Sequence, residues 1–184
     1  MIRVAINGYG RIGRVAHRVI LESHSKEIDL VAINAGSSTD IKGWAYLLKY
    51  DTSYGPLDRN VKPQISNVKD SVGSLVIDDK EIPVFSQKDP SKLPWEELSV
   101  DVVIESTGTF RDEEGLKAHI SAGAGGVVLS APLKDGDVPT YIISVNSMDY
   151  KGENAISNAS CTTNCITPVA KIMMEAFGIE KAMM

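Results

Sequence analysis

Residues able to carry out covalent chemistry stand together in the run Ala159-Ser160-Cys161-Thr162-Thr163-Asn164-Cys165. The run is polar and compact, and an apolar pattern with helical spacing follows it at once. Cys161 is therefore expected at or next to a helix N-terminus, where free backbone N–H groups and the helix dipole favour an anion. That anion can be a thiolate, an oxyanion or a phosphate. On spacing alone, a buried structural cysteine is an equally good interpretation.

A second candidate site is the glycine-rich stretch Asn7-Gly8-Tyr9-Gly10-Arg11-Ile12-Gly13-Arg14. Its glycines have the G-x-G-x-x-G spacing of dinucleotide-binding turns and stand between a predicted strand and a predicted helix. In such a turn Gly8 permits the tight bend, Gly10 lets a pyrophosphate approach the backbone, and Gly13 lets helix and strand pack closely. A glycine turn with a purely structural role is the alternative.

These sites need a scaffold that brings them to one edge of a sheet. Runs rich in β-branched residues predict strands at 2–7, 28–34, 101–105, 127–130, 141–145 and 155–157, and a hairpin from 74–77 and 82–85. Helical patterns follow residue 40, surround Leu116 and extend from 162 to 177. The first helix is expected to face the core with Ile12, Val15, Ala16, Val19 and Ile20. This alternation indicates an α/β fold, a Rossmann-type doubly wound parallel sheet.

Composition narrows the class of protein. The 184 residues suggest one domain with a full-sized core, and 43% hydrophobic and 23% charged residues are ordinary for a globular protein. A net charge of −5 without a lysine- or arginine-rich run argues against nucleic acid and anionic membranes as partners. No membrane-spanning run and no signal-peptide pattern are present. Two cysteines four apart do not indicate a disulfide framework, so a cytoplasmic location is expected.

The run at 160–165 and the glycine turn at 7–14 together closely resemble phosphorylating glyceraldehyde-3-phosphate dehydrogenases, and the resemblance extends from Ile2 to the last residue. It implies a dinucleotide-binding domain over 1–159 and the first helix of a truncated catalytic domain over 160–184. It also implies a glycolytic enzyme that oxidises an aldehyde phosphate and joins it to inorganic phosphate through a cysteine thioester, with hydride passing to NAD or NADP. The full-length protein is expected to be a homotetramer.

The resemblance assigns roles to individual residues. Cys161 is the nucleophile and its backbone amide helps to hold the oxyanion, while Ser160 and Thr162 contact substrate or inorganic phosphate. A basic residue at the place of Lys88 lies near the adenine end of the cofactor, and Ser130 belongs to the loop near the nicotinamide. The complete set of expected cofactor contacts is Gly8, Gly10, Arg11, Ile12, Gly13, Ser37, Lys88, Thr107, Gly108 and Ser130. No metal is expected.

The sequence departs from the family at the end of the second predicted strand, where Ala35 stands in place of the common Asp. An acid there accepts hydrogen bonds from the adenosine ribose hydroxyls. Its absence removes a contact to NAD and also a charge that would repel a 2′-phosphate, to which Ser37, Ser38 and the Gly36 amide could donate. We expect NADP to be accepted at least as well as in a typical NAD-specific member; a slightly weaker NAD site is the alternative.

A nucleophilic cysteine also needs a base within hydrogen-bond reach. His17, His24 and His119 belong to segments that are not expected to meet Cys161. In the family the catalytic histidine lies on a strand just beyond this segment, so the chain is expected to stop short of it. It should then bind dinucleotide, show little or no turnover alone, and either expose apolar surface or bury that surface in a self-association contact. The alternatives are an erythrose-4-phosphate dehydrogenase, which shares both motifs, and a non-catalytic dinucleotide-binding module.

Overall fold

The structure, a computed structural model, describes all 184 residues. One sheet of eight strands has the order β10-β9-β8-β1-β2-β7-β6-β5. Its strands are β1 (Ile2–Asn7), β2 (Ile28–Asn34), β5 (Val61–Gln64), β6 (Ser71–Ile77), β7 (Lys80–Phe85), β8 (Val102–Glu105), β9 (Gly126–Leu129) and β10 (Ala155–Ser157). A separate two-stranded ribbon consists of β3 (Tyr50–Asp51) and β4 (Gly55–Pro56).

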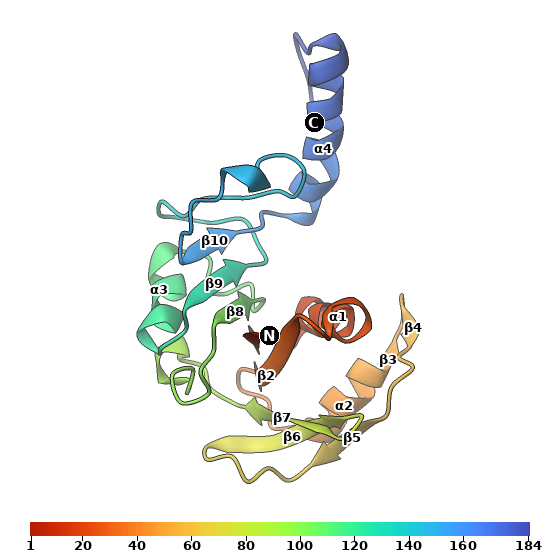
Figure 1. The fold of residues 1–184 in the computed structure, drawn as a ribbon, viewed down its shortest axis with the longest axis vertical. Coiled ribbons are helices and arrows are strands. Elements are labelled where there is room, and N and C mark those ends of the chain that lie inside the picture. Colours follow the sequence, from red (N-terminus) through yellow and green to blue (C-terminus); the bar gives the residue numbers. More distant parts are fainter.

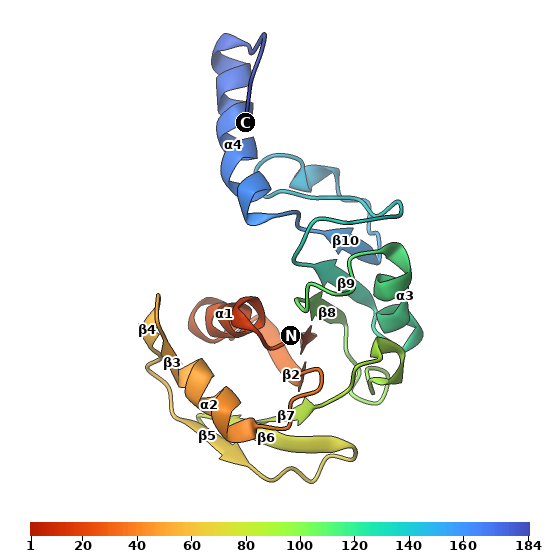
Figure 2. The ribbon, with the colours of Figure 1, turned by 180° about the vertical axis from the view of Figure 1, so that it is seen from behind.

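Helices lie on both faces of this sheet. They are α1 (Arg11–Val19), which continues as a π-helix η1 (Ile20–His24), α2 (Ile41–Lys49), α3 (Glu113–Ser121) and α4 (Cys161–Phe177), with 3-10 turns η2 (Pro90–Lys92) and η3 (Ser147–Asp149). Helices α1 and α2 cover one face and α3 the other, while α4 leads away from the body (Figure 1; Figure 2).

The six strands from β10 to β7 run parallel to one another. Numbered by their appearance in the chain, they have the spatial order 6-5-4-1-2-3, which is the Rossmann order. This confirms the predicted fold class. Strand order reverses between β1 and β8, and in open sheets of this kind ligands bind at the carboxyl ends of the strands beside such a reversal. The predicted hairpin is also present, as the antiparallel pair β6 and β7.

The core consists of one apolar cluster on each face of the sheet. Because side chains alternate along a strand, Val4 and Ile6 of β1 join the cluster under α2, whereas Ala5 joins the cluster under α3. Trp95 and Leu116 are fully buried in the second cluster. The two clusters hold the parallel strands in register, and with them the loops at both edges.

The strand predicted at 141–145 is wrong. Only Thr140 bridges to Ser157, and the following residues form a turn. The Asn146 side chain closes this turn, since its Oδ1 accepts from the Ile142 amide at 2.8 Å and its Nδ2 donates to the Thr140 carbonyl at 2.9 Å. Ile143 is consequently 77% exposed. A local side-chain hydrogen bond here outweighs the β-propensity of the residues.

The predicted buried face of α1 is confirmed only in part, since Ile20 is buried and Val15 and Ala16 are half-buried. Ile12 and Val19 are about half exposed, whereas His17 and Arg18 are buried. The Arg18 guanidinium donates to the carbonyls of Leu48, Lys49 and Gly55, so it closes the C-terminal end of α2 and joins it to the β3–β4 ribbon. The face of α1 that the helical pattern predicted to be polar and exposed is therefore buried at His17 and Arg18.

Apolar surface is exposed, as expected. No residue of α4 is buried, and Ile166, Val169, Met173 and Phe177 are open to solvent. A groove of about 520 Å³, lined mostly by apolar residues of α1, β1, β8 and β9, lies on the α1 side of the sheet. None of the helices combines the length and the apolar character that a bilayer crossing requires.

His17 yields a prediction about pH. Its Nδ1 shares a 2.7 Å hydrogen bond with the Tyr9 hydroxyl, its Nε2 has no partner, and burial lowers the pKa of His17 to about 3 from the ordinary 6.5. In the unfolded chain the imidazole takes up a proton below pH 6.5, whereas the folded chain resists it until about pH 3. The stabilising contribution is therefore complete above pH 6.5 and falls by about 1.4 kcal/mol per pH unit on acidification.

The His17→Gln variant should lack this dependence, because its amide oxygen can still accept from Tyr9 but does not titrate. Urea unfolding at about pH 7, 6 and 5 should show the stability gap between wild type and variant narrowing as the pH falls. His24→Gln is the matched control, since His24 is exposed and pairs with Glu27. Stability curves of wild type and His17→Gln that run parallel would contradict the assignment.

Candidate active site

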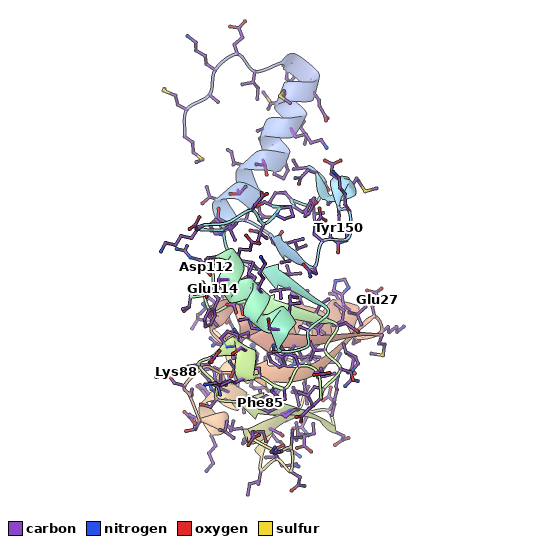
Figure 3. The ribbon with its side chains drawn as sticks, turned by 90° about the vertical axis from the view of Figure 1, so that its left-hand side faces the viewer. Glu27, Phe85, Lys88, Asp112, Glu114 and Tyr150 are labelled. Atoms are coloured by element: carbon purple, nitrogen blue, oxygen red, sulfur yellow. The ribbon has the colours of Figure 1, made fainter.

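All the predicted site residues follow the carboxyl ends of parallel strands. From β7 to β10 the order along the edge is Lys88, Ser37, the glycine turn, Thr107 with Gly108, Ser130, and Ser160 with Cys161 and Thr162. Five strand spacings of about 4.8 Å separate the two ends of this row by roughly 24 Å. Figure 3 shows Lys88, Asp112 and Glu114 on one side of the molecule, and Glu27 and Tyr150, which precede β2 and β10, on the opposite side.

The glycine turn lies where β1 and β8 approach most closely. Gly8 has φ +94°, and a Cβ on it would lie 2.5 Å from the backbone nitrogen of Thr107. A Cβ on Gly13 would lie 2.1 Å from the carbonyl oxygen of Gly8. The expected structural reasons for both glycines are therefore confirmed. The Gly10 α-carbon faces open space, with no atom within 4 Å of a Cβ there.

The N-terminus of α1 is free to receive an anion. Its N-cap is Gly10 and no side chain caps it, so the first amides of the helix, including those of Arg11 and Ile12, have no partner within the helix. The Arg11 guanidinium itself binds Asp51 at 2.9 Å. Backbone N–H groups of Ser53 and Tyr54, together with Arg11, hold the pKa of Asp51 down to about 2. Arg11 and Ile12 thus offer backbone amides to a ligand, while the Arg11 side chain fixes the β3–β4 ribbon.

The loop after β2 contains the expected departure at Ala35. Gly36 has φ +68° and Ser37 is exposed. The Ser38 hydroxyl oxygen accepts from Trp44 Nε1 at 3.1 Å, which leaves its own proton available for donation. Lys88 is exposed on the neighbouring loop after β7. Two hydroxyls and a cation therefore lie on the two adjacent loops.

The loop after β8 is held by a residue that sequence reasoning missed, Glu105. This carboxylate is fully buried and accepts from both the amide, at 2.7 Å, and the hydroxyl of Thr107. Ser106 donates from its hydroxyl to the carbonyl of Gly8 at 2.7 Å and so joins this loop to the glycine turn. An acid ending a buried apolar strand was the available signal. Ser130 is half-buried on the next loop, and its amide donates to the carbonyl of Glu105.

Cys161 is the first residue of α4 and its side chain is exposed, so the interpretation as a buried structural cysteine is wrong. Ser160 is the N-cap, and its hydroxyl oxygen accepts from the Thr163 amide at 3.0 Å. Asn164 Nδ2 donates to the carbonyls of Asn158 and Ser160. These bonds fix the turn between β10 and α4, so the sulfur lies at the carboxyl edge of the sheet. Thr162 is exposed beside it.

The histidines lie elsewhere, as expected. His17 and His119 are buried on opposite faces of the sheet, and His24 forms an exposed pair with Glu27 at 3.0 Å. None is bonded to the turn that carries Cys161. The arrangement combines an exposed thiol at the start of α4, an uncapped N-terminus of α1 that can bind an anion, and polar loops along one edge of the sheet. It has the parts for cofactor binding and for nucleophilic attack, without a base at the sulfur.

Comparison with known proteins agrees with this geometry. The family model described as "Glyceraldehyde 3-phosphate dehydrogenase, NAD binding domain" matches residues 2–113, and the one described as "Glyceraldehyde 3-phosphate dehydrogenase, C-terminal domain" matches residues 160–184.

Similar proteins include glyceraldehyde-3-phosphate dehydrogenases from Clostridium pasteurianum and Thermotoga maritima, 49% and 48% identical over 185 aligned residues. A cytosolic one from Trypanosoma brucei brucei is 45% identical over 184 residues. In each case the match covers 100% of this chain and 52–53% of the relative, so the chain spans about half the length of the curated relatives it matches. The chain belongs to the glyceraldehyde-3-phosphate dehydrogenase family and carries its NAD-binding domain.

Proposed function

We propose that this chain supplies the cofactor site and the nucleophile of a phosphorylating glyceraldehyde-3-phosphate dehydrogenase acting in glycolysis. One observation carries the proposal. The exposed Cys161 at the start of α4 and the uncapped N-terminus of α1 lie on the same carboxyl edge of one parallel sheet. A dinucleotide laid along that edge would join the two, with its pyrophosphate at α1 and its nicotinamide towards Cys161.

The residues present fit a dinucleotide. Gly10 leaves open space for the approach of a phosphate, and the amides of Arg11 and Ile12 are donors for its oxygens. Ser37 and Lys88 would hold the adenosine end, while Thr107, Gly108 and Ser130 would line the path to the nicotinamide. Bound NAD or NADP supplies a two-electron acceptor for hydride.

The chain's own part in the chemistry follows from Cys161. Its thiolate adds to the aldehyde carbon, forming a C–S bond and leaving the negative charge on the former carbonyl oxygen. The Cys161 amide and the positive end of the α4 dipole stabilise that oxygen. A base takes the thiol proton before the attack, and loss of the hydrogen on the same carbon as hydride then turns the C–O⁻ group into a carbonyl and gives a thioester. Inorganic phosphate, contacted by Thr162 and Ser160, then displaces the sulfur and releases an acyl phosphate.

The base for this proton transfer has to come from outside these 184 residues, because no histidine meets the Cys161 turn. The proposal therefore places the complete reaction in a larger assembly, a homotetramer of full-length chains. It also places the protein in the cytoplasm; one similar protein is named cytosolic and another, from Chlamydomonas reinhardtii, chloroplastic. Within this proposal, residues 1–159 form the cofactor domain and 160–184 begin the catalytic domain.

The first prediction separates binding from turnover. Calorimetry should detect NAD binding to the 184-residue chain, because the dinucleotide edge is complete. An assay with glyceraldehyde 3-phosphate, phosphate and NAD or NADP should show no turnover above that of Cys161→Ser, because the base is lacking. Ordinary turnover by the isolated chain would contradict the proposal, and so would a chain that binds neither cofactor.

The second prediction concerns the two thiols. Both are exposed, but only Cys161 is at the start of α4, where free N–H groups stabilise a thiolate. A thiol reagent at neutral pH should label Cys165→Ser rapidly and Cys161→Ser slowly. Mass spectrometry of the labelled peptides is the measurement. Equal labelling rates for the two variants would remove the assignment of Cys161 as the activated thiol.

The third prediction concerns cofactor choice. Without an acid at Ala35, the dissociation constants for NADP and NAD should lie within about tenfold of each other. Ala35→Asp should weaken NADP by about tenfold or more, because the carboxylate repels the 2′-phosphate. Ser37→Ala is the companion variant and should weaken NADP alone. Wild-type binding of NAD that is at least about tenfold tighter than that of NADP would contradict this account.

A further inference from the structure

A continuous hydrogen-bonded network of buried polar side chains lies beneath the carboxyl edge of the sheet. Trp95 Nε1 donates to His119 Nδ1 at 3.0 Å, and His119 Nε2 lies 3.1 Å from Glu105 Oε2, which also accepts from Asn7 Nδ2. Asn34 Nδ2 donates to Asn7 Oδ1 at 2.6 Å. Asn34 is bonded in turn to both the amide and the carbonyl of Gln87. The members Trp95, His119, Glu105, Asn7 and Asn34 are all at most 2% exposed.

The hydrogen-bond partners determine which atoms of this network carry the protons. Because the indole N–H can only donate, His119 Nδ1 must accept, and the neutral ring then carries its proton on Nε2 and donates to Glu105. Glu105 thus receives four donors: two from Thr107, one from Asn7 and one from His119. Four donors satisfy an ionised carboxylate. A buried negative charge is held here by neutral groups, with no cation bonded to it.

Each inner member of this network immediately precedes a loop of the proposed cofactor site. Asn7 precedes Gly8, and Asn34 precedes the Ala35–Ser37 loop. Gln87 precedes Lys88, and Glu105 accepts a hydrogen bond from the Thr107 amide. The network crosses the ends of β7, β2, β1 and β8, which are neighbours in the sheet. The same network therefore connects the bases of four loops.

We propose that Glu105, held by His119, is the positioning residue that sets the Thr107 loop and the glycine turn for the pyrophosphate and nicotinamide half of the cofactor. This rests on the proposed function. Two of its four donors come from the Thr107 loop and one from the residue before Gly8, so its carboxylate fixes the distance between the two loops that flank the crevice. The adenosine end is held separately, through Asn34 and Gln87.

The test uses two ligands that divide the site. NAD spans the whole row, whereas adenosine, which has no phosphate, reaches only the loops after β2 and β7. In Glu105→Gln the amide N–H₂ opposes two of the four donors. Calorimetry should show NAD weakened by about tenfold or more and adenosine changed by less than about twofold. The control is Ser74→Ala, a change at a buried polar residue of β6 outside this network, which should alter neither ligand.

A second pair of variants guards against misfolding of Glu105→Gln. His119→Leu removes the donor to Glu105 and should weaken NAD several-fold, while His119→Gln keeps an N–H at the same place and should bind NAD within about twofold of wild type. Equal NAD affinity in the two His119 variants, or equal weakening of NAD and adenosine in Glu105→Gln, would overturn the positioning role. Failure of the wild-type chain to bind NAD would instead overturn the proposed function.

Discussion

The close approach of β1 and β8 at their carboxyl ends is the constraint on which the rest of the site depends. Ser106 donates to the backbone carbonyls of Asn7 and Gly8, and the space left over admits no side chain on Gly8. Gly13 in turn brings α1 against the same carbonyl. Because the strand order reverses at this pair, the tight contact below creates the crevice above it. Any side chain at Gly8 or Gly13 would force apart the elements that define the site.

The polar interior beneath that contact contributes order rather than a large net stability. Hydrogen bonds made on folding replace bonds to water, so a satisfied buried network stabilises little in total, whereas one unmatched donor in it is costly. Glu105 illustrates the consequence, since its four donors leave one arrangement for the loops around it. A cofactor meeting such loops has less conformational entropy to remove on binding. The network is thus a means of pre-organisation built from neutral donors and one anion.

The sulfur end of the edge is organised differently. The cofactor loops rest on buried strands and a buried network, whereas Cys161 rests on a single capped turn between β10 and a helix with no buried residue. An apolar helix with no buried residue has surface to bury against another element. In the proposed function that element belongs to the larger assembly, together with the base that Cys161 needs. The loops after β1, β2 and β8 thus lie on a well-packed edge, whereas Cys161 lies on a turn that leads into a helix with no buried residue.

Short stretches of the sequence determined much of the local structure of this protein. The glycine spacing required a tight strand-to-helix turn, and the polar run before an apolar helix put Cys161 at a helix start, because both signals depend only on neighbouring residues. Tertiary structure decided what distant residues share. It turned 141–145 from strand to turn through Asn146, buried His17 and Arg18 on a face that periodicity had called polar, and joined Glu105 to Asn7 and His119. Periodicity reports the hydrophobicity of one segment, whereas a buried polar residue is stable only through partners brought to it by the fold.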